Sequence, residues 1–186
     1  MRPAILGVML IALSGCASAQ QTSPGVAPVA PLCAPGVMLG KVVVAPLTRW
    51  RADQKEPEVR EAIAQKAIEA IAPAIPCAAS VKVLPIAVDA QSAERLAAAK
   101  AEGAATALLI RIDELGPITI LSFPALWSTY SDVQFTLEAV DTQTGNTLRS
   151  IPHHRRKGGA FEVRGLDPLQ GEMEQALKEV VLGAGK

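Results

Sequence analysis

The densest run of ionisable side chains in the sequence is basic and has the letters HHRRK. Such a run could face phosphate headgroups, an acidic polysaccharide or an acidic partner, or it could be solvated at a strand end or in a loop. Adjacent histidines on an extended strand point to opposite faces, so they are not spaced as ligands of one metal ion. We therefore predict no metal site and a basic patch made of His153, His154, Arg155, Arg156 and Lys157.

Two other groups of polar residues could carry chemistry. Asp113 and Glu114 are adjacent carboxylates, which could act as general acid and base, but at a strand end we expect them to face water. The segment Arg49–Arg51 follows a predicted strand and could line a pocket at the carboxyl end of a sheet or form a surface loop. The chain has no HExxH, no GxSxG and no glycine loop that cradles phosphate. We predict no catalytic residue and no enzyme activity.

An apolar insertion, residues 115–130, contains three of the six aromatic residues of the chain, Phe123, Trp127 and Tyr130. Its apolar side chains could fold back over the sheet and complete the core. Alternatively, the insertion forms a contact surface for another subunit, a partner protein or the lipid interface, where Trp and Tyr are favoured. Trp127 is the strongest anchor of such a surface.

The first fifteen residues have the plan of a secretory signal peptide, with Arg2 before a short apolar run and small residues after it. The run is too short to span a membrane. The letters LSGC, ending at Cys16, resemble the lipobox of bacterial lipoproteins, in which the cysteine is acylated and becomes the mature N-terminus. The alternative is a cut after Ala19 by ordinary signal peptidase, which would release a soluble protein. We expect a covalent lipid on Cys16 and no other cofactor.

The lipobox resemblance also implies a location. Ala17 follows the cysteine and is not the aspartate that marks inner-membrane retention, so we expect the periplasmic face of the outer membrane. Without residues 1–15 the chain keeps 17 basic side chains, since only Arg2 is lost from 18, against 18 acidic ones. This nearly neutral balance argues against nucleic acid as a partner, because such binding requires many phosphate contacts from Lys and Arg.

The two remaining cysteines, Cys33 and Cys77, would lie in an oxidising compartment where disulfides persist. We expect them to pair. The alternative is that both are small buried hydrophobic side chains.

Periodicity and turn residues predict the elements that carry these groups. Strands are expected over residues 39–46, 81–88, 105–113, 133–139, 147–151 and 160–165. Helices are expected over residues 57–71, 92–102 and 168–182. The prediction is a single α/β (α+β) domain, with a mixed sheet of five or six strands, two helices in the N-terminal half and one at the C-terminus. Residues 1–15 would be the signal peptide, 16–38 the lipidated cysteine and a proline-rich linker, and 39–186 the periplasmic domain.

Three stretches together resemble a known set of envelope lipoproteins: VVVAP, AEGAATALLIRID and the hairpin TLEAVDTQTGNTL. Their fold is similar to the N-terminal domain of TolB and to the periplasmic domain of the curli secretion channel. Asp141, Thr144 and Gly145 match the D-x-x-T-G hairpin of that group. The resemblance covers about residues 39–182 and marks a fold more than a chemistry.

Members of that group include secretion-channel subunits, a ring-forming lipoprotein of polysaccharide export and a lipoprotein that activates a peptidoglycan synthase. The resemblance therefore implies a non-catalytic accessory subunit of an envelope export or surface-structure assembly, acting by self-association or by binding an envelope protein. The alternative it leaves open is a tethered periplasmic regulator of a cell-envelope enzyme.

Overall fold

The computed structural model describes residues 30–121, 123 and 126–183. The predicted signal peptide, the lipidation of Cys16 and residues 16–29 of the predicted linker lie outside the described residues.

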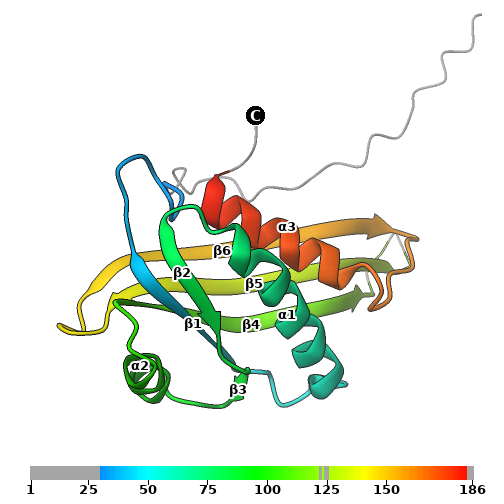
Figure 1. Ribbon diagram of the computed structural model, residues 1–186. Coiled ribbons are helices and arrows are strands. Elements are labelled where there is room, and N and C mark those ends of the chain that lie inside the picture. The colour runs from blue at the N-terminus through cyan, green and yellow to red at the C-terminus, as the bar shows by residue number, and fades with distance from the viewer. Residues whose placement is uncertain (1–29, 122, 124–125, 184–186) are drawn as a thin grey trace, which may run out of the picture.

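The described chain forms one mixed sheet, whose six strands run in the order β2-β1-β4-β5-β6, with β3 beside the end of β1 (Figure 1). The first three strands of that order are parallel, and β4, β5 and β6 form an antiparallel meander. The strands are β1 (Gly40–Thr48), β2 (Ala78–Val83), β3 (Ala87–Val88), β4 (Thr106–Ile120), β5 (Ser128–Asp141) and β6 (Thr147–Ala160).

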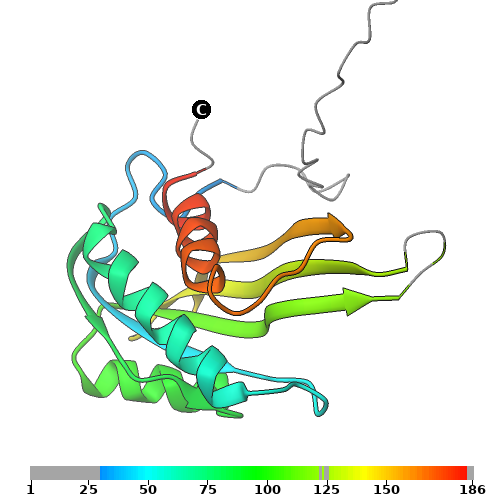
Figure 2. The same cartoon turned by 90° about the vertical axis from the view of Figure 1, so that its right-hand side faces the viewer.

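Helices cover both faces of this sheet, but unequally. The helices are α1 (Pro57–Ile71), followed by the short η1 (Ala72–Ala74), α2 (Ser92–Ala101) and α3 (Leu169–Leu182). The helices α1 and α3 pack side by side over one face, and α2 packs on the other (Figures 1 and 2). The α+β class is confirmed. The prediction of two helices in the N-terminal half is only partly right, because α2 lies at the midpoint of the 186-residue chain.

Strand β1 is buried on both faces because it lies between the two helical layers. Val42 and Val44 point into the larger core, under α1 and α3, while Val43 and Ala45 point into the smaller core, under α2. Full burial of one valine side chain contributes about 1.5–3 kcal/mol. The uninterrupted β-branched run that predicted a strand buried on both sides is thus explained.

The folded body begins before residue 39. The backbone N–H groups of Leu32 and Cys33 donate to the carbonyls of Val180 and Val181 in α3. Leu32 is buried in the larger core. The expected disulfide joins Cys33 to Cys77, with a Cα–Cα distance of 5.3 Å, and ties this segment to the start of β2. Residues 30–38 therefore belong to the domain and not to a linker.

The second half of the sheet is more regular than the sequence suggested. The turn predicted after Asp141 is present, and the Asp141 carboxylate accepts hydrogen bonds from the backbone of Gln143 and Thr144. The basic run lies inside β6, which continues to Ala160. The last strand predicted over residues 160–165 is wrong, because Phe161 has a φ of 60°, which ends β6.

The two adjacent glycines, Gly158 and Gly159, lie within β6. A Cβ on Gly158 would overlap the Thr129 carbonyl and lie 2.9 Å from Tyr130 Cα. Glycine at this position therefore permits close pairing of β5 and β6.

Candidate functional site

Strands β4, β5 and β6 extend well beyond the parallel half of the sheet. The last residue of β1, Thr48, pairs with Ile112, and β4 continues from there to Ile120. Ile118 to Ile120 pair with Ser128 to Tyr130 of β5, which in turn pair with Gly158 to Ala160 of β6. Figure 2 shows this arm extending past the helices. The predicted insertion, residues 115–130, is therefore mostly strand.

Large apolar side chains gather, exposed, at the end of this arm. Phe123 is 95% exposed, Leu121 is 80% exposed and Trp127 is 38% exposed. Trp127 forms an edge-to-face pair with Phe161, with ring centroids 5.4 Å apart, and its carbonyl accepts a hydrogen bond from the Phe161 backbone N–H. We call this surface the apolar tip; its described residues are Ile120, Leu121, Phe123, Leu126, Trp127 and Phe161.

The exposure of the apolar tip argues against one of the two interpretations of the insertion. Phe123 and Trp127 do not complete the core, so the interpretation in which they fold back over the sheet is wrong for these residues. Tyr130, expected to share their surface, instead lies under the guanidinium of Arg156, 5.5 Å from its ring centroid. Phe161 was missed, although it follows the basic run and the two glycines by only a few residues.

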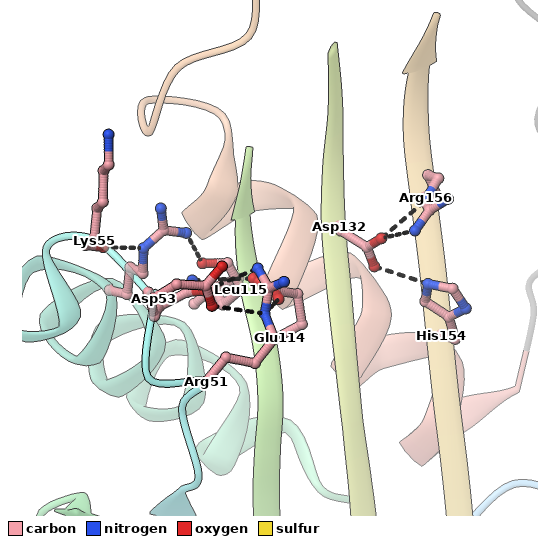
Figure 3. A network of polar contacts seen from close by, with 10 residues as sticks. Arg51, Asp53, Lys55, Glu114, Leu115, Asp132, His154 and Arg156 are labelled. Carbon is pink, nitrogen blue, oxygen red and sulfur yellow. Dashed lines mark hydrogen bonds and ion pairs between the residues drawn. The ribbon is translucent and has the colours of Figure 1, made fainter. Parts of the chain in front are cut away.

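Asp132 is a buried carboxylate and the first charged residue of β5 after the apolar tip. The Asp132 side chain is only 2% exposed. Its two oxygens lie 2.8 Å from Nε of Arg156 and 2.8 Å from Nε2 of His154 on the neighbouring strand (Figure 3). Asp132 was not singled out from the sequence, because a lone acid in a strand carries no signal of a partner in β6.

The predicted basic patch does not exist as one surface. The alternation of the strand directs His154 and Arg156 to Asp132, while His153 and Arg155 point to the opposite face, where both meet Glu179 of α3. The remaining member, Lys157, is exposed. The expectation that the two histidines diverge is confirmed.

His153 lies in an apolar environment. Its ring packs on Phe135, with centroids 5.2 Å apart, and Nε2 lies 3.7 Å from a carboxylate oxygen of Glu179. Burial lowers the pKa of His153, and the negative charge of Glu179 only partly opposes that shift. The imidazole is therefore held towards its neutral form.

A second polar cluster secures the other side of the arm. Glu114 is buried and accepts a hydrogen bond from the Gln54 side chain at 3.0 Å, and Nε of Arg51 lies 3.2 Å from its other oxygen (Figure 3). The buried Arg60 of α1 donates from Nε to the Lys55 carbonyl at 2.7 Å and from Nη1 to the Leu115 carbonyl. This cluster attaches α1 to β4 where β1 has ended.

This cluster corrects an expectation from the sequence. Asp113 and Glu114 do not both face water at a strand end, because Glu114 is buried at an irregularity of the β4–β5 register. Arg51 pairs with Glu114, and the indole N–H of Trp50 donates to Glu61 at 2.8 Å. These residues connect the loop after β1 to α1 and β4.

A hollow of about 270 Å³ between α1 and β2 has Glu69 as its only charged wall residue. In residues 30–121, 123 and 126–183 no three side chains of His, Cys, Asp or Glu are grouped so that they could hold a metal ion. No helix in the same part of the chain is long and apolar enough to cross a membrane.

The fold and site thus define a one-sheet α+β domain with an exposed apolar tip. Comparison with models of protein families gives no match, and comparison with curated proteins gives none either. Among solved structures, the chain is similar to the PelC dodecamer from Paraburkholderia phytofirmans, with 18% identity, a TM-score of 0.46, and coverage of 80% of this chain and 90% of that one.

Two further similarities are to a lipoprotein and to the C-terminal domain of LpoB. Lipoprotein GNA1162 from Neisseria meningitidis has 17% identity and a TM-score of 0.38, with coverage of 78% of this chain and 99% of that one. The LpoB C-terminal domain from Salmonella enterica has 13% identity and a TM-score of 0.34, with coverage of 66% and 87%. At this level of similarity the comparisons establish neither a family nor a function.

Proposed function

We propose that the protein is a non-catalytic, lipid-tethered accessory subunit of an envelope export or surface-structure assembly. Its lipid on Cys16 would hold it at the periplasmic face of the outer membrane. It would act through contacts made by the apolar tip, not by turnover. The observation that carries this proposal is the exposure of Phe123, Leu121 and their neighbours at the end of a paired three-strand arm.

The exposure of these side chains favours a contact with another molecule. Burying a phenylalanine or leucine side chain contributes about 1.5–3 kcal/mol, yet the fold leaves Phe123 and Leu121 outside its core. An apolar patch of several side chains on one surface is typical of an interaction site. The Trp127–Phe161 pair stiffens the base of the apolar tip, so part of the surface is preformed for binding.

The polar groups favour a structural role over catalysis. Asp132 pairs with Arg156 and lies 2.8 Å from Nε2 of His154, and Glu114 pairs with Arg51. Each carboxylate thus has partners within the fold, which leaves the apolar tip as the chemically distinctive surface.

In-cell photo-crosslinking tests this proposal. A photoreactive benzoylphenylalanine is placed at Phe123 and, as a matched control, at Leu148, which is 56% exposed on β6 near the other end of the strand. We expect light-dependent adducts, with protein or lipid, from position 123 and not from position 148. Equal adduct yields at the two positions would refute contact through the apolar tip.

Two further measurements test the tether and the assembly. The Cys16→Ser variant should no longer incorporate labelled palmitate and should leave the outer-membrane fraction. Light scattering on the detergent-extracted lipoprotein should give a discrete oligomer or complex. A monomeric mass would instead favour the tethered regulator of an envelope enzyme.

A further inference from the structure

We infer that the apolar tip inserts into the interfacial layer of a phospholipid bilayer, on the side of the membrane that carries the lipid anchor. This inference rests on the proposed function, in which the apolar tip is the contact surface, and it names the contact as lipid. Four observations carry it: a charge-free end, the side chains at its surface, a cationic boundary and the reach of the tether.

Charge is absent from the three strands at the end of the arm. Residues 115–131 contain no charged side chain, and the end of β6, residues 158–160, consists of Gly, Gly and Ala, followed by Phe161. The segment after β6 places Glu162 and Arg164 beside the two glycines, where their side chains pair with each other.

On the strands, charge begins within two residues of one level: Asp132 of β5 pairs in register with Arg156 of β6, and Glu114 of β4 pairs in register with Gln134. This narrow change in polarity along the strands matches the boundary between an apolar phase and water.

The side chains beyond this boundary are those that the membrane interface favours. Trp127 is partly exposed at the base of the apolar tip, where an amphipathic indole can lie at headgroup depth. Phe123 and Leu121 are the most exposed apolar side chains of the connecting segment and extend furthest from the core contacts. Hydroxyl groups accompany them, and Thr119 and Thr129 approach each other at 3.5 Å across the β4–β5 pair.

The backbone of the arm limits the depth of insertion. Ser128 lies four positions before Asp132 along β5. At about 3.3 Å per position, the end of β5 is roughly 13 Å beyond Asp132. Among the described residues, the outer edges of β6 and of β4 beyond Ile112 have no partner strand. Unpaired backbone groups are costly in hydrocarbon. The side chains of the apolar tip therefore enter to about 5–10 Å, the depth of interfacial segments.

Cationic groups lie where lipid headgroups would meet the protein. Lys157 is exposed and pairs in register with Ser131, next to the charged boundary. Arg156 is partly exposed at the same level, with Tyr130 beneath its guanidinium, but its charge is balanced by Asp132. Lys157 therefore carries the net positive charge, and a basic side chain close to an anionic membrane surface contributes about 1 kcal/mol.

The tether is long enough for the lipid and the apolar tip to reach the same leaflet. The described chain starts at Ala30, whose carbonyl accepts a hydrogen bond from Arg149, and Arg149 pairs with Ala139. The eleven residues from Ala139 back to Ser128 span roughly 36 Å of strand. The fourteen residues from Cys16 to Ala30 can reach about 50 Å when extended.

Tryptophan quenching tests the inference in the complete lipoprotein, because the chain has only two tryptophans. The Trp50→Phe variant keeps Trp127 at the apolar tip, and the Trp127→Phe variant keeps Trp50 beside α1. Both proteins are reconstituted through their lipid into vesicles of phosphatidylethanolamine and phosphatidylglycerol. Matched vesicles contain phospholipids brominated near the headgroup end or near the methyl end of the acyl chain.

We expect a blue shift and a loss of Trp127 fluorescence, larger with the shallow bromine, and no loss for Trp50. Adding Phe123→Asp to the Trp50→Phe protein should restore the fluorescence, whereas adding Leu148→Asp should not. The thermal unfolding of both variants should match that of the parent, because both side chains are exposed. Equal quenching of Trp50 and Trp127 would overturn the inference.

The lipid inference and the proposed function fail in different ways. Photo-crosslinking from position 123 to a protein, together with no quenching of Trp127, would keep the apolar tip as a contact surface but exclude lipid as its partner. No adduct from position 123 and no quenching would refute both. Stronger quenching by the deep bromine would overturn the interfacial depth.

Discussion

Gly116 is expected to be required because of its closeness to a buried arginine. A Cβ at Gly116 would overlap Nη1 of Arg60, whose guanidinium donates to the carbonyls of Leu115 and Lys55. Gly116→Ala should therefore displace the guanidinium. A hydrogen bond from a charged donor contributes about 1.5–3 kcal/mol, and replacing glycine by alanine within a strand restores roughly 0.5–1 kcal/mol. Loss of the one hydrogen bond from Nη1 should therefore lower the free energy of unfolding by about 0.5–2.5 kcal/mol.

A double-mutant cycle isolates this effect. Urea unfolding, followed by far-UV circular dichroism, is measured for the parent, Gly116→Ala, Arg60→Ala and the double variant. The Arg60→Ala substitution removes the guanidinium that a Cβ at position 116 would overlap. In that background, Gly116→Ala should therefore change the free energy of unfolding little. The coupling free energy should be about 2 kcal/mol.

Gly165→Ala is the matched control, since a Cβ there meets open space, and its unfolding free energy should stay near that of the parent. Additive effects of Gly116→Ala and Arg60→Ala would refute the reasoning. An unfolding free energy of Gly116→Ala equal to that of the parent would also refute it. That result would mean that the guanidinium can move without a loss of stability.

Two further predictions concern the disulfide and pH. Replacing both Cys33 and Cys77 by Ser should lower the free energy of unfolding by about 4 kcal/mol, the chain-entropy value for a separation of 44 residues. Reductant should destabilise the parent in urea unfolding but leave the double variant unchanged. Burial lowers the pKa of His153, so the folded state binds fewer protons than the unfolded state, and stability should fall as pH drops from about 7 to 5, through the ordinary histidine pKa of about 6.5. His153→Gln should flatten this dependence in urea unfolding at several pH values, and an unchanged slope would contradict the assignment to His153.

Local patterns were sufficient to predict the elements that depend on local causes. The run from Val42 to Ala45 predicted a strand buried on both faces, because burial of every side chain needs an uninterrupted apolar run. Asp141 predicted its turn, because its carboxylate bonds to the backbone just after it. These causes act over a few residues and can be read from the order of the letters.

The position and exposure of the apolar tip depend on pairing between segments that are distant in the sequence. The proline-bearing insertion indicated a loop, but pairing with β5 extended β4 to Ile120 and placed Phe123 at the end of an arm. Phe161 joined the same surface from a distant stretch of chain. Whether an apolar side chain is buried depends on which element covers it, and the helices α1 and α3 end before this part of the sheet (Figure 2).

The sequence by itself determined the α+β set of elements, two cysteines suited to a disulfide, and the apolar, charge-free character of residues 115–131. Strand alternation also determined that His153 and His154 would face opposite ways. Only the tertiary structure decided what each of them meets, Glu179 on α3 or Asp132 on β5, because that depends on strand register and on the placement of a helix. The same register places Asp132 beside Arg156 and leaves the apolar tip beyond them.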